Sequence, residues 1–236
     1  MLMINESRSI QSLERGMLIL EYIAQQHGTA QLSDISKALN LSKSTVHGLL
    51  NTLAALGYIS REGTAYTLGL RLNSLSKQII HVSQNIKENY WPLMQWTAKL
   101  SGQTCYLACP CGSKEYLYLA ALNHNEEFDI KKQFRSPRES LTASAIGKVI
   151  LANSLDLRRS LARANLLNPQ IVLELEHIQK NGYAIDFENA EVGLNCFAIP
   201  LFQNGKLIAA LGISGKSQYF TPEKMFKILP KLLQKI

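Results

Sequence analysis

Residues 32–58 constrain the fold most strongly, because they predict two short helices joined by a tight turn. The first helix is expected over 34–39, and Asn40 tolerates the left-handed backbone that a turn needs. Ser42 suits the N-cap of the second helix, and Gly57 suits its end. The second helix has one apolar stripe at helical spacing, made of Val46, Leu49, Leu50, Leu53 and Leu56.

The opposite face of the second helix carries hydroxyls, amides and one cation, but no acid. Its members are Ser42, Lys43, Ser44, Thr45, His47, Gly48, Asn51 and Thr52. No Asp or Glu occurs between Asp34 and Glu62. Such a face suits the DNA major groove, where base edges and phosphates are approached closely. We therefore predict that these eight residues contact double-stranded operator DNA, as in a helix-turn-helix. A plain helical hairpin with a solvated face is the alternative interpretation.

The flanking residues predict the rest of a DNA-binding domain. Residues 58–68 indicate two short strands around a Glu62-Gly63 turn, which is the hairpin called a wing. Residues 10–26 indicate a further helix that completes a three-helix core. Its expected apolar face consists of Leu13, Met17, Leu20 and Ile23, widened by Ile19.

Residues 70–88 indicate a linker helix. Its apolar residues follow a 3-4-3-4 spacing, which is typical of a dimerisation seam. They are Leu72, Leu75, Ile79, Val82 and Ile86. A helix packed on its own domain is the alternative. Two DNA readers on a two-fold axis would match a pseudo-palindromic operator.

Residues 89–236 have a mixed pattern that predicts an α+β domain with an antiparallel sheet. Helices are expected over 91–100, 142–152, 155–164, 169–181 and from 222 onward, and strands over 103–110, 115–122, 128–134, 183–187, 195–202 and 206–214.

Composition and charge limit the partners and the cellular compartment that we expect for this chain. The 236 residues carry a net charge of +7, of which residues 1–88 contribute +2 and residues 89–236 contribute +5. The DNA-binding hypothesis therefore rests on the local helix face. No apolar run approaches the roughly 20 residues of a membrane span, and residues 1–11 lack a signal-peptide core. Four cysteines in a chain of this length do not indicate a disulfide framework, so we expect a cytoplasmic protein without membrane contact.

Several segments resemble the IclR family of bacterial transcriptional regulators. The N-terminal segments are SIQSLERGMLILEYI, LSDISKALNLSKSTVHGLLNTLAALGYI and YTLGLRL, and the C-terminal segments are TASAIGKVILA, IQKNGYAIDFENAEVGLNCFAIPLF and IAALGISG. The resemblance implies a winged helix-turn-helix over 1–69, a linker or dimerisation helix over 70–88 and a GAF-like effector-binding domain over 89–236.

The resemblance also implies function and site residues. It implies a repressor that acts as a homodimer or a dimer of dimers and responds to a small metabolite. The helix N-terminus near residues 142–146 offers free N–H groups to a carboxylate, so we expect an organic or sugar acid as the effector. We expect no cofactor and no metal. The effector residues carried over by motif are Ala145, Ile146, Asp186, Cys196 and Ser214. Two positions depart from the family pattern: Gly48 replaces an Arg, and Asn189 replaces one acid of a pair with Glu188.

The sequence leaves two other function classes to weigh. Cys105, Cys109 and Cys111 would share one strand face, so the alternative is a regulator that senses metal or redox state through cysteine. An enzyme is disfavoured. Residues 212–216 resemble a nucleophile elbow but lack its last glycine, and no phosphate-binding loop or HExxH motif is present.

Overall fold

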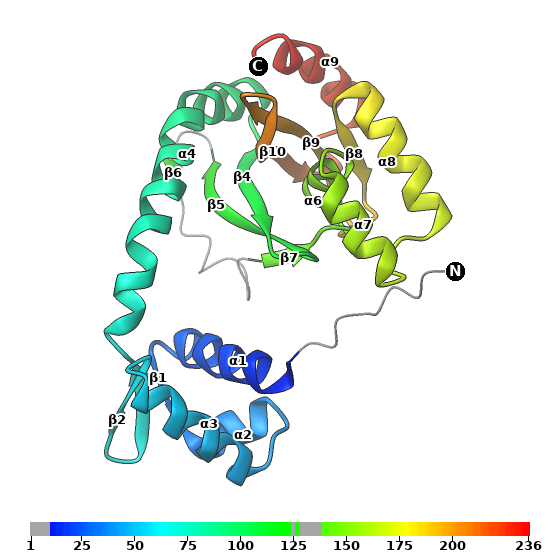
Figure 1. Cartoon of the computed structure of the whole chain (residues 1–236). Helices are drawn as coiled ribbons and strands as arrows, with labels where there is room; N and C mark the ends of the chain where they lie inside the picture. Colours follow the sequence, from blue (N-terminus) through cyan, green and yellow to red (C-terminus); the bar gives the residue numbers. More distant parts are fainter. Residues whose placement is uncertain (1–9, 124–125, 128–137) are drawn as a thin grey trace. The chain divides into compact units, whose positions relative to one another are not determined.

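The computed structural model describes residues 10–123, 126–127 and 138–236. It divides into two units, residues 1–82 and 83–236, and each is described separately below (Figure 1). The strand expected over 128–134 lies outside the described residues. The α+β class is confirmed, with a winged helix-turn-helix in the first unit and an antiparallel sheet with helices in the second.

The first unit contains the expected helices and wing. Its elements are α1 (Gln11–Gln25), β1 (Thr29–Gln31), α2 (Leu32–Ala38), α3 (Lys43–Ala55), β2 (Ile59–Glu62) and β3 (Ala65–Leu68). The strands pair antiparallel in the order β1-β3-β2. Strand β1 was not predicted, because three residues with a single buried side chain, Ala30, are too short to show alternation.

The three helices enclose one hydrophobic core. Ile23 of α1, Ile35 of α2 and Leu50 of α3 are fully buried in it. The expected buried face of α1 was partly wrong, since Leu13 is 64% exposed and Met17 is 51% exposed. The helix is rotated so that Gly16, Ile19, Leu20 and Ile23 face the core instead. Leu13 and Met17 of α1 therefore remain outside the core although they follow helical spacing.

Helix α4 (Arg71–Ser101) is one continuous helix, whereas two helices were expected over 70–88 and 91–100. Pro92 lies inside it, where proline removes a backbone hydrogen bond and costs roughly 3 kcal/mol. Met94 and Ala98 are fully buried against the sheet of the second unit. This burial stabilises the helical turns that follow Pro92, and it depends on distant strands that a local sequence pattern does not reveal.

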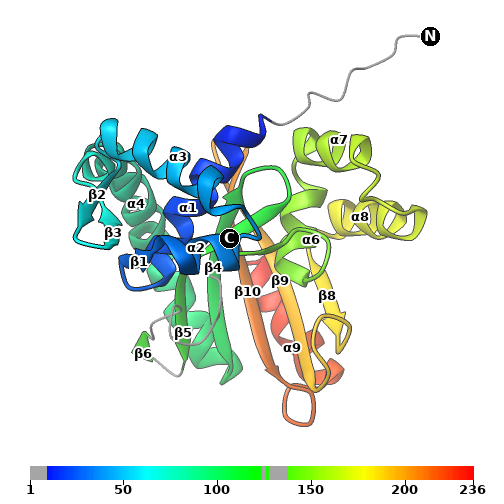
Figure 2. The ribbon, with the colours of Figure 1, turned by 90° about the horizontal axis from the view of Figure 1, so that it is seen from below.

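The described part of the second unit contains a seven-stranded antiparallel sheet. Six strands follow the order β6-β5-β4-β10-β9-β8, and β7 pairs with β5. The strands are β4 (Thr104–Cys111), β5 (Glu115–Asn123), β6 (Glu126–Glu127), β7 (Arg138–Ser140), β8 (Ala184–Phe187), β9 (Leu194–Gln203) and β10 (Lys206–Lys216). Figure 2 shows β10, β9 and β8 side by side.

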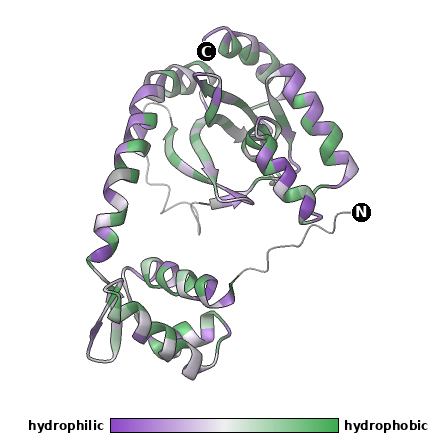
Figure 3. Ribbon diagram, viewed as in Figure 1, coloured by the Kyte–Doolittle hydropathy of each residue, from purple (hydrophilic) through white to green (hydrophobic). Residues whose placement is uncertain are grey.

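Helices cover both faces of this sheet. One face packs against α4 and α9 (Pro222–Leu233), and the other packs against α6 (Ala145–Ala152), α7 (Leu155–Arg163) and α8 (Pro169–Asn181). The strands between these layers are mostly hydrophobic (Figure 3). Alternate residues of β4 therefore enter different cores, with Leu107 on the α4 side and Ala108 on the α6 side.

Local signals placed the turn between β9 and β10 correctly. Asn204 and Gly205 both have positive φ, at 51° and 73°, as the predicted hairpin turn requires. Helix α6 starts at Ala145 rather than at residue 142, because Ser144 is its N-cap and accepts a hydrogen bond from Gly147 N at 3.2 Å. Thr142 therefore lies in the preceding turn.

Candidate functional site

Helix α3 is positioned by the turn and cap that the sequence indicates. Asn40 has a left-handed φ of 51° in the turn after α2. Ser42 is the N-cap, and its hydroxyl accepts a hydrogen bond from Thr45 N at 3.1 Å. Val46 and Leu50 are fully buried and anchor the opposite side of the helix in the core. The first turn of α3 is thus held rigidly with its polar side outward.

The predicted DNA-contact residues lie on the surface of α3. Thr45 is half-buried, and the other seven are exposed: Ser42, Lys43, Ser44, His47, Gly48, Asn51 and Thr52. Two contacts order this face. Asn51 Nδ2 lies 3.4 Å from His47 Nδ1, and the Thr52 hydroxyl donates to Gly48 O at 3.0 Å. A Cβ added at Gly48 would meet nothing within 4 Å, so this position is a gap on the helix surface.

The wing adds a cation that the sequence analysis did not select. Arg61 Nε donates to Gly63 O at 3.0 Å, and its guanidinium lies 5.9 Å from the centroid of the Tyr66 ring. These contacts hold the exposed Arg61 on the hairpin. The sequence signal that could have identified Arg61 is its place in the predicted wing, two positions before the turn glycine.

A cavity of about 320 Å³ lies in the second unit, between the sheet and the N-terminus of α6. Its lining is formed by Tyr106, Tyr116, Tyr118, Glu139, Ser140, Ala143, Ser144, Ala145, Ile146, Ala190, Glu191, Leu194, Cys196, Phe197, Gly212, Ile213 and Ser214. This volume falls at the small end of the range for ligand sites. Most of the lining is apolar and aromatic, including three tyrosines, and a few polar groups lie within it.

Four of the five predicted effector residues line this cavity, namely Ala145, Ile146, Cys196 and Ser214. Ala145 and Ile146 belong to the first turn of α6, whose N–H groups have no partner within the helix. Cys196 and Ser214 face each other on β9 and β10 in the same register pair. Burial raises the pKa of the Cys196 thiol to about 11, so this side chain is a neutral lining group at pH 7.

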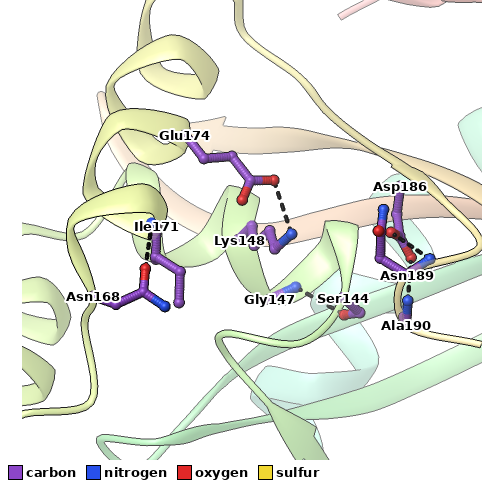
Figure 4. Close-up of polar contacts among 9 residues, drawn as sticks. All are labelled: Ser144, Gly147, Lys148, Asn168, Ile171, Glu174, Asp186, Asn189 and Ala190. Atoms are coloured by element: carbon purple, nitrogen blue, oxygen red, sulfur yellow. Dashed lines mark hydrogen bonds and ion pairs between the residues drawn. The ribbon is translucent and has the colours of Figure 1, made fainter.

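The fifth predicted residue, Asp186, is 1% exposed and does not line the cavity. Its Oδ1 accepts from Asn189 N at 3.2 Å, and its Oδ2 accepts from Ala190 N at 2.9 Å (Figure 4). Ala190 and the adjacent Glu191 do line the cavity. Asp186 therefore fixes the loop that forms one wall.

A hydrogen-bond network in the cavity lining was missed from sequence. Tyr116 is fully buried, and its hydroxyl donates to Glu139 Oε2 at 2.5 Å. The same hydroxyl lies 2.7 Å from Ser144 Oγ and 3.2 Å from Tyr118 Oη. Burial and the nearby Glu139 charge raise the pKa of Tyr116, so it remains a donor. Tyr106, Tyr116 and Tyr118 alternate on the inward face of one hairpin, and this was the available signal.

The cysteines are placed unfavourably for sensing. Cys105 and Cys109 face the same hydrophobic core as α4 and α9. Burial raises the pKa of each of these thiols to about 12. Since the thiolate is the nucleophile and the metal ligand, such pKa values disfavour both roles. Across the described ranges, no group of three or more His, Cys, Asp or Glu side chains is placed to hold a metal ion.

Two family models cover most of the chain. The model for the IclR helix-turn-helix domain matches residues 12–63. The model for the C-terminal region of the bacterial transcriptional regulator IclR matches residues 78–236.

In the described ranges, no helix combines the length and the apolar character that a membrane span requires.

Individual relatives agree with these models. The HTH-type transcriptional repressors AllR of Salmonella paratyphi A and Escherichia coli K12 are each 29% identical to the chain, and each match covers 92% of the chain and 84% of the relative. An IclR-family regulator from Brucella abortus has a TM-score of 0.70 at 21% identity, covering 97% of this chain and 90% of that one. An IclR homologue from Microbacterium hydrocarbonoxydans, solved with 4-hydroxybenzoate, has a TM-score of 0.66 at 22% identity, covering 94% and 95%.

Together with the two matching family models, the winged helix-turn-helix and the α+β domain with its cavity define a class of DNA-binding transcriptional regulators. The two family models together span nearly all of the described residues. The chain belongs to the IclR family of bacterial transcriptional regulators.

Proposed function

We propose that this protein represses transcription from a specific operator, and that a small polar effector in the cavity of the second unit changes its affinity for DNA. One observation carries the proposal. The same chain combines an exposed, acid-free helix face on α3 with a cavity of about 320 Å³ whose lining includes the start of α6. The AllR relatives, which are named repressors, support the sign of regulation.

The proposed DNA contacts divide into two kinds. Lys43 carries the cation of the face and is suited to phosphate, whereas His47 and Asn51 carry ring and amide groups that suit base edges. Ser42, Ser44, Thr45 and Thr52 provide hydroxyls, and Gly48 permits close approach of the backbone. Phosphate contacts position the helix and base contacts select the sequence.

The effector site is proposed at the N-terminus of α6. The first N–H groups of a helix attract anions through their partial positive charge. A carboxylate of an organic or sugar acid therefore fits beside Ala145 and Ile146, with Cys196 and Ser214 across the cavity. Asp186 supports this site through the loop at Ala190. Occupancy would shift the population of the DNA-competent conformation.

The functional protein is proposed to be a homodimer or a dimer of dimers. Ile10, Leu13 and Met17 of the α1 region are at least half exposed, as are Leu75, Ile79 and Val82 of α4. Apolar side chains at helical spacing on a surface favour a second copy of the chain as partner. Two recognition helices would then meet half-sites about one helical turn of DNA apart.

We infer that each of three segments has its own role. Residues 1–69 bind DNA, residues 70–88 mediate dimerisation and residues 89–236 bind the effector. The boundary between the two units falls inside the second of these segments. A cytoplasmic location is consistent with an operator DNA partner and with the four cysteines, which are free thiols in the structure.

The test begins with selection of bound sequences from a random duplex library by the full-length protein. Lys43→Ala should weaken binding to the selected site and lower the salt slope by about one, because one phosphate contact is lost. Lys180→Ala removes the same charge from the exposed surface of α8 and serves as the control. An equal change in both variants would remove Lys43 from the interface.

The effector half of the proposal is tested by a thermal-shift screen of organic, sugar and aromatic acids. A ligand that binds the folded state raises its melting temperature. The stabilising compound should then release the protein from the selected duplex. A stabiliser that leaves operator affinity unchanged would contradict the regulatory role of the cavity.

A further inference from the structure

The cavity lining includes a second polar group, Glu139, close to the first turn of α6. Its carboxylate accepts a hydrogen bond from Tyr116 at 2.5 Å, and Tyr116 Oη lies 2.7 Å from Ser144 Oγ. Ser144 is the N-cap of α6 and accepts from Gly147 N. Two successive short hydrogen bonds therefore separate the Glu139 carboxylate from the helix terminus where a ligand carboxylate is proposed. A single small molecule can therefore contact both the helix terminus and Glu139.

The direction of these hydrogen bonds shows which groups near Glu139 donate and which accept. Tyr116 uses its proton on Glu139, so the Ser144 hydroxyl donates to the Tyr116 oxygen, because Ser144 itself accepts from Gly147 N. The hydroxyl protons of Tyr116 and Ser144 are thus directed away from the ligand. A carboxylate has about four lone-pair sites, so Glu139 retains acceptor capacity. Glu139 therefore offers the ligand a hydrogen-bond acceptor.

Charge reinforces this polarity. Among the described residues that line the cavity, Glu139 and Glu191 are the ionisable acids, and no Lys, Arg or His side chain is present. Glu139 is half-buried, whereas Glu191 is exposed at the rim. A negative group in a partly buried, aromatic site attracts a cation more strongly than a solvated one does. The rings of Tyr106 and Tyr118, with centroids 5.3 Å apart, add faces that also favour a cation.

We infer that the effector carries an amino group that binds Glu139 as an ammonium ion, in addition to the carboxylate at the start of α6. The effector class is then an amino-carboxylic acid rather than a simple organic or sugar acid. This inference rests on the proposed function, because Glu139 is a second polar group of the same effector site. Glu139 is assigned as the specificity-determining residue.

The test uses benzoates that differ only in one substituent. The probes are 3- and 4-(aminomethyl)benzoate, the matching hydroxymethylbenzoates and the matching methylbenzoates, and binding to the full-length protein is measured by calorimetry. At least one aminomethyl probe should bind about tenfold tighter than its methyl counterpart, as expected for a charge-assisted hydrogen bond. Equal affinities, or tighter binding of the methyl probes, would overturn the inference.

Two variants assign the preference to one carboxylate. Glu139→Gln keeps an acceptor for Tyr116 but removes the charge, so the aminomethyl preference should disappear. Glu191→Gln removes the same charge from the rim and should retain the preference within about twofold. Thermal unfolding of both variants with a cooperative transition like that of the wild type shows that they are folded. A preference that survives Glu139→Gln would overturn the assignment.

The outcomes also separate this inference from the proposed function. If amine-free acids bind the cavity and release the operator, the proposed function stands and the amino-acid class is wrong. If the aminomethyl probes bind through Glu139 but leave operator affinity unchanged, the inference stands and the regulatory proposal fails. If none of the probes binds, the inference is overturned, whereas the proposed function is decided separately by the wider screen of organic, sugar and aromatic acids.

Discussion

The hydroxyl of Ser42 accepts a hydrogen bond from the backbone N–H of Thr45 at 3.1 Å, at the point where α3 begins. Ser42 is also one of the exposed residues of the proposed DNA-binding face. One side chain therefore serves helix stability and, by our proposal, DNA contact. Two substitutions separate these roles.

Ser42→Ala should lower the free energy of unfolding by about 1 kcal/mol, as loss of an N-cap does. Ser42→Asp should keep the cap and most of the stability, since aspartate is an equally good N-cap. The aspartate variant nevertheless places a negative charge beside phosphate and should lose operator affinity. Urea unfolding and fluorescence anisotropy with the selected duplex measure the two quantities. An aspartate variant that binds DNA like the wild type would place Ser42 outside the interface.

Gly48 provides a gain-of-function prediction. A Cβ there meets nothing within 4 Å, so a side chain fits without strain. Gly48→Ala should stabilise the helix by up to about 1 kcal/mol, because glycine is a poor helix former. Gly48→Arg should give a similar gain and should also bind DNA more tightly, with a salt slope steeper by about one. Anisotropy titrations at several salt concentrations compare the two variants. Equal slopes would show that position 48 does not approach phosphate.

Features set by a few neighbouring residues were predictable from sequence. The cap at Ser42, the left-handed Asn40 and the Asn204-Gly205 turn depend on contacts or backbone preferences within one turn of chain. The apolar stripe of α3 was also correct at its centre, since Val46 and Leu50 are fully buried. Four cavity residues came from the family resemblance and not from the residues themselves.

Features that depend on distant partners were missed. Tyr116 and Glu139 are 23 positions apart and meet only because β7 pairs with β5. The rotation of α1, which leaves Met17 exposed, depends on which of two neighbouring apolar stripes meets the other helices. The continuity of α4 through Pro92 depends on burial of the turns after it. None of these contacts leaves a periodic signal in the sequence.

Asp186 should act on the cavity through its loop. Both of its oxygens accept backbone N–H groups, and it is 1% exposed. Asp186→Asn replaces one acceptor with a donor and should lower the free energy of unfolding by about 1–3 kcal/mol. The thermal shift produced by the effector should shrink, while operator affinity is retained. Glu188→Gln alters an exposed contact to Gly193 and should have a smaller effect on both measurements. An effector response unchanged by Asp186→Asn would contradict this role of the loop.

Cys105 predicts how stability depends on pH. Burial raises the pKa of its thiol from 9.0 to about 12, so the folded chain keeps a proton that the unfolded chain releases above pH 9. The contribution of this thiol is therefore complete below pH 9 and is lost progressively between pH 9 and 12. From pH 9 to 10 the loss should be on the order of 1 kcal/mol. Urea unfolding at both pH values measures it, and Cys105→Ala should reduce the difference whereas Cys111→Ala should not. The same difference in all three proteins would mean that other groups, and not the Cys105 thiol, determine the alkaline loss of stability.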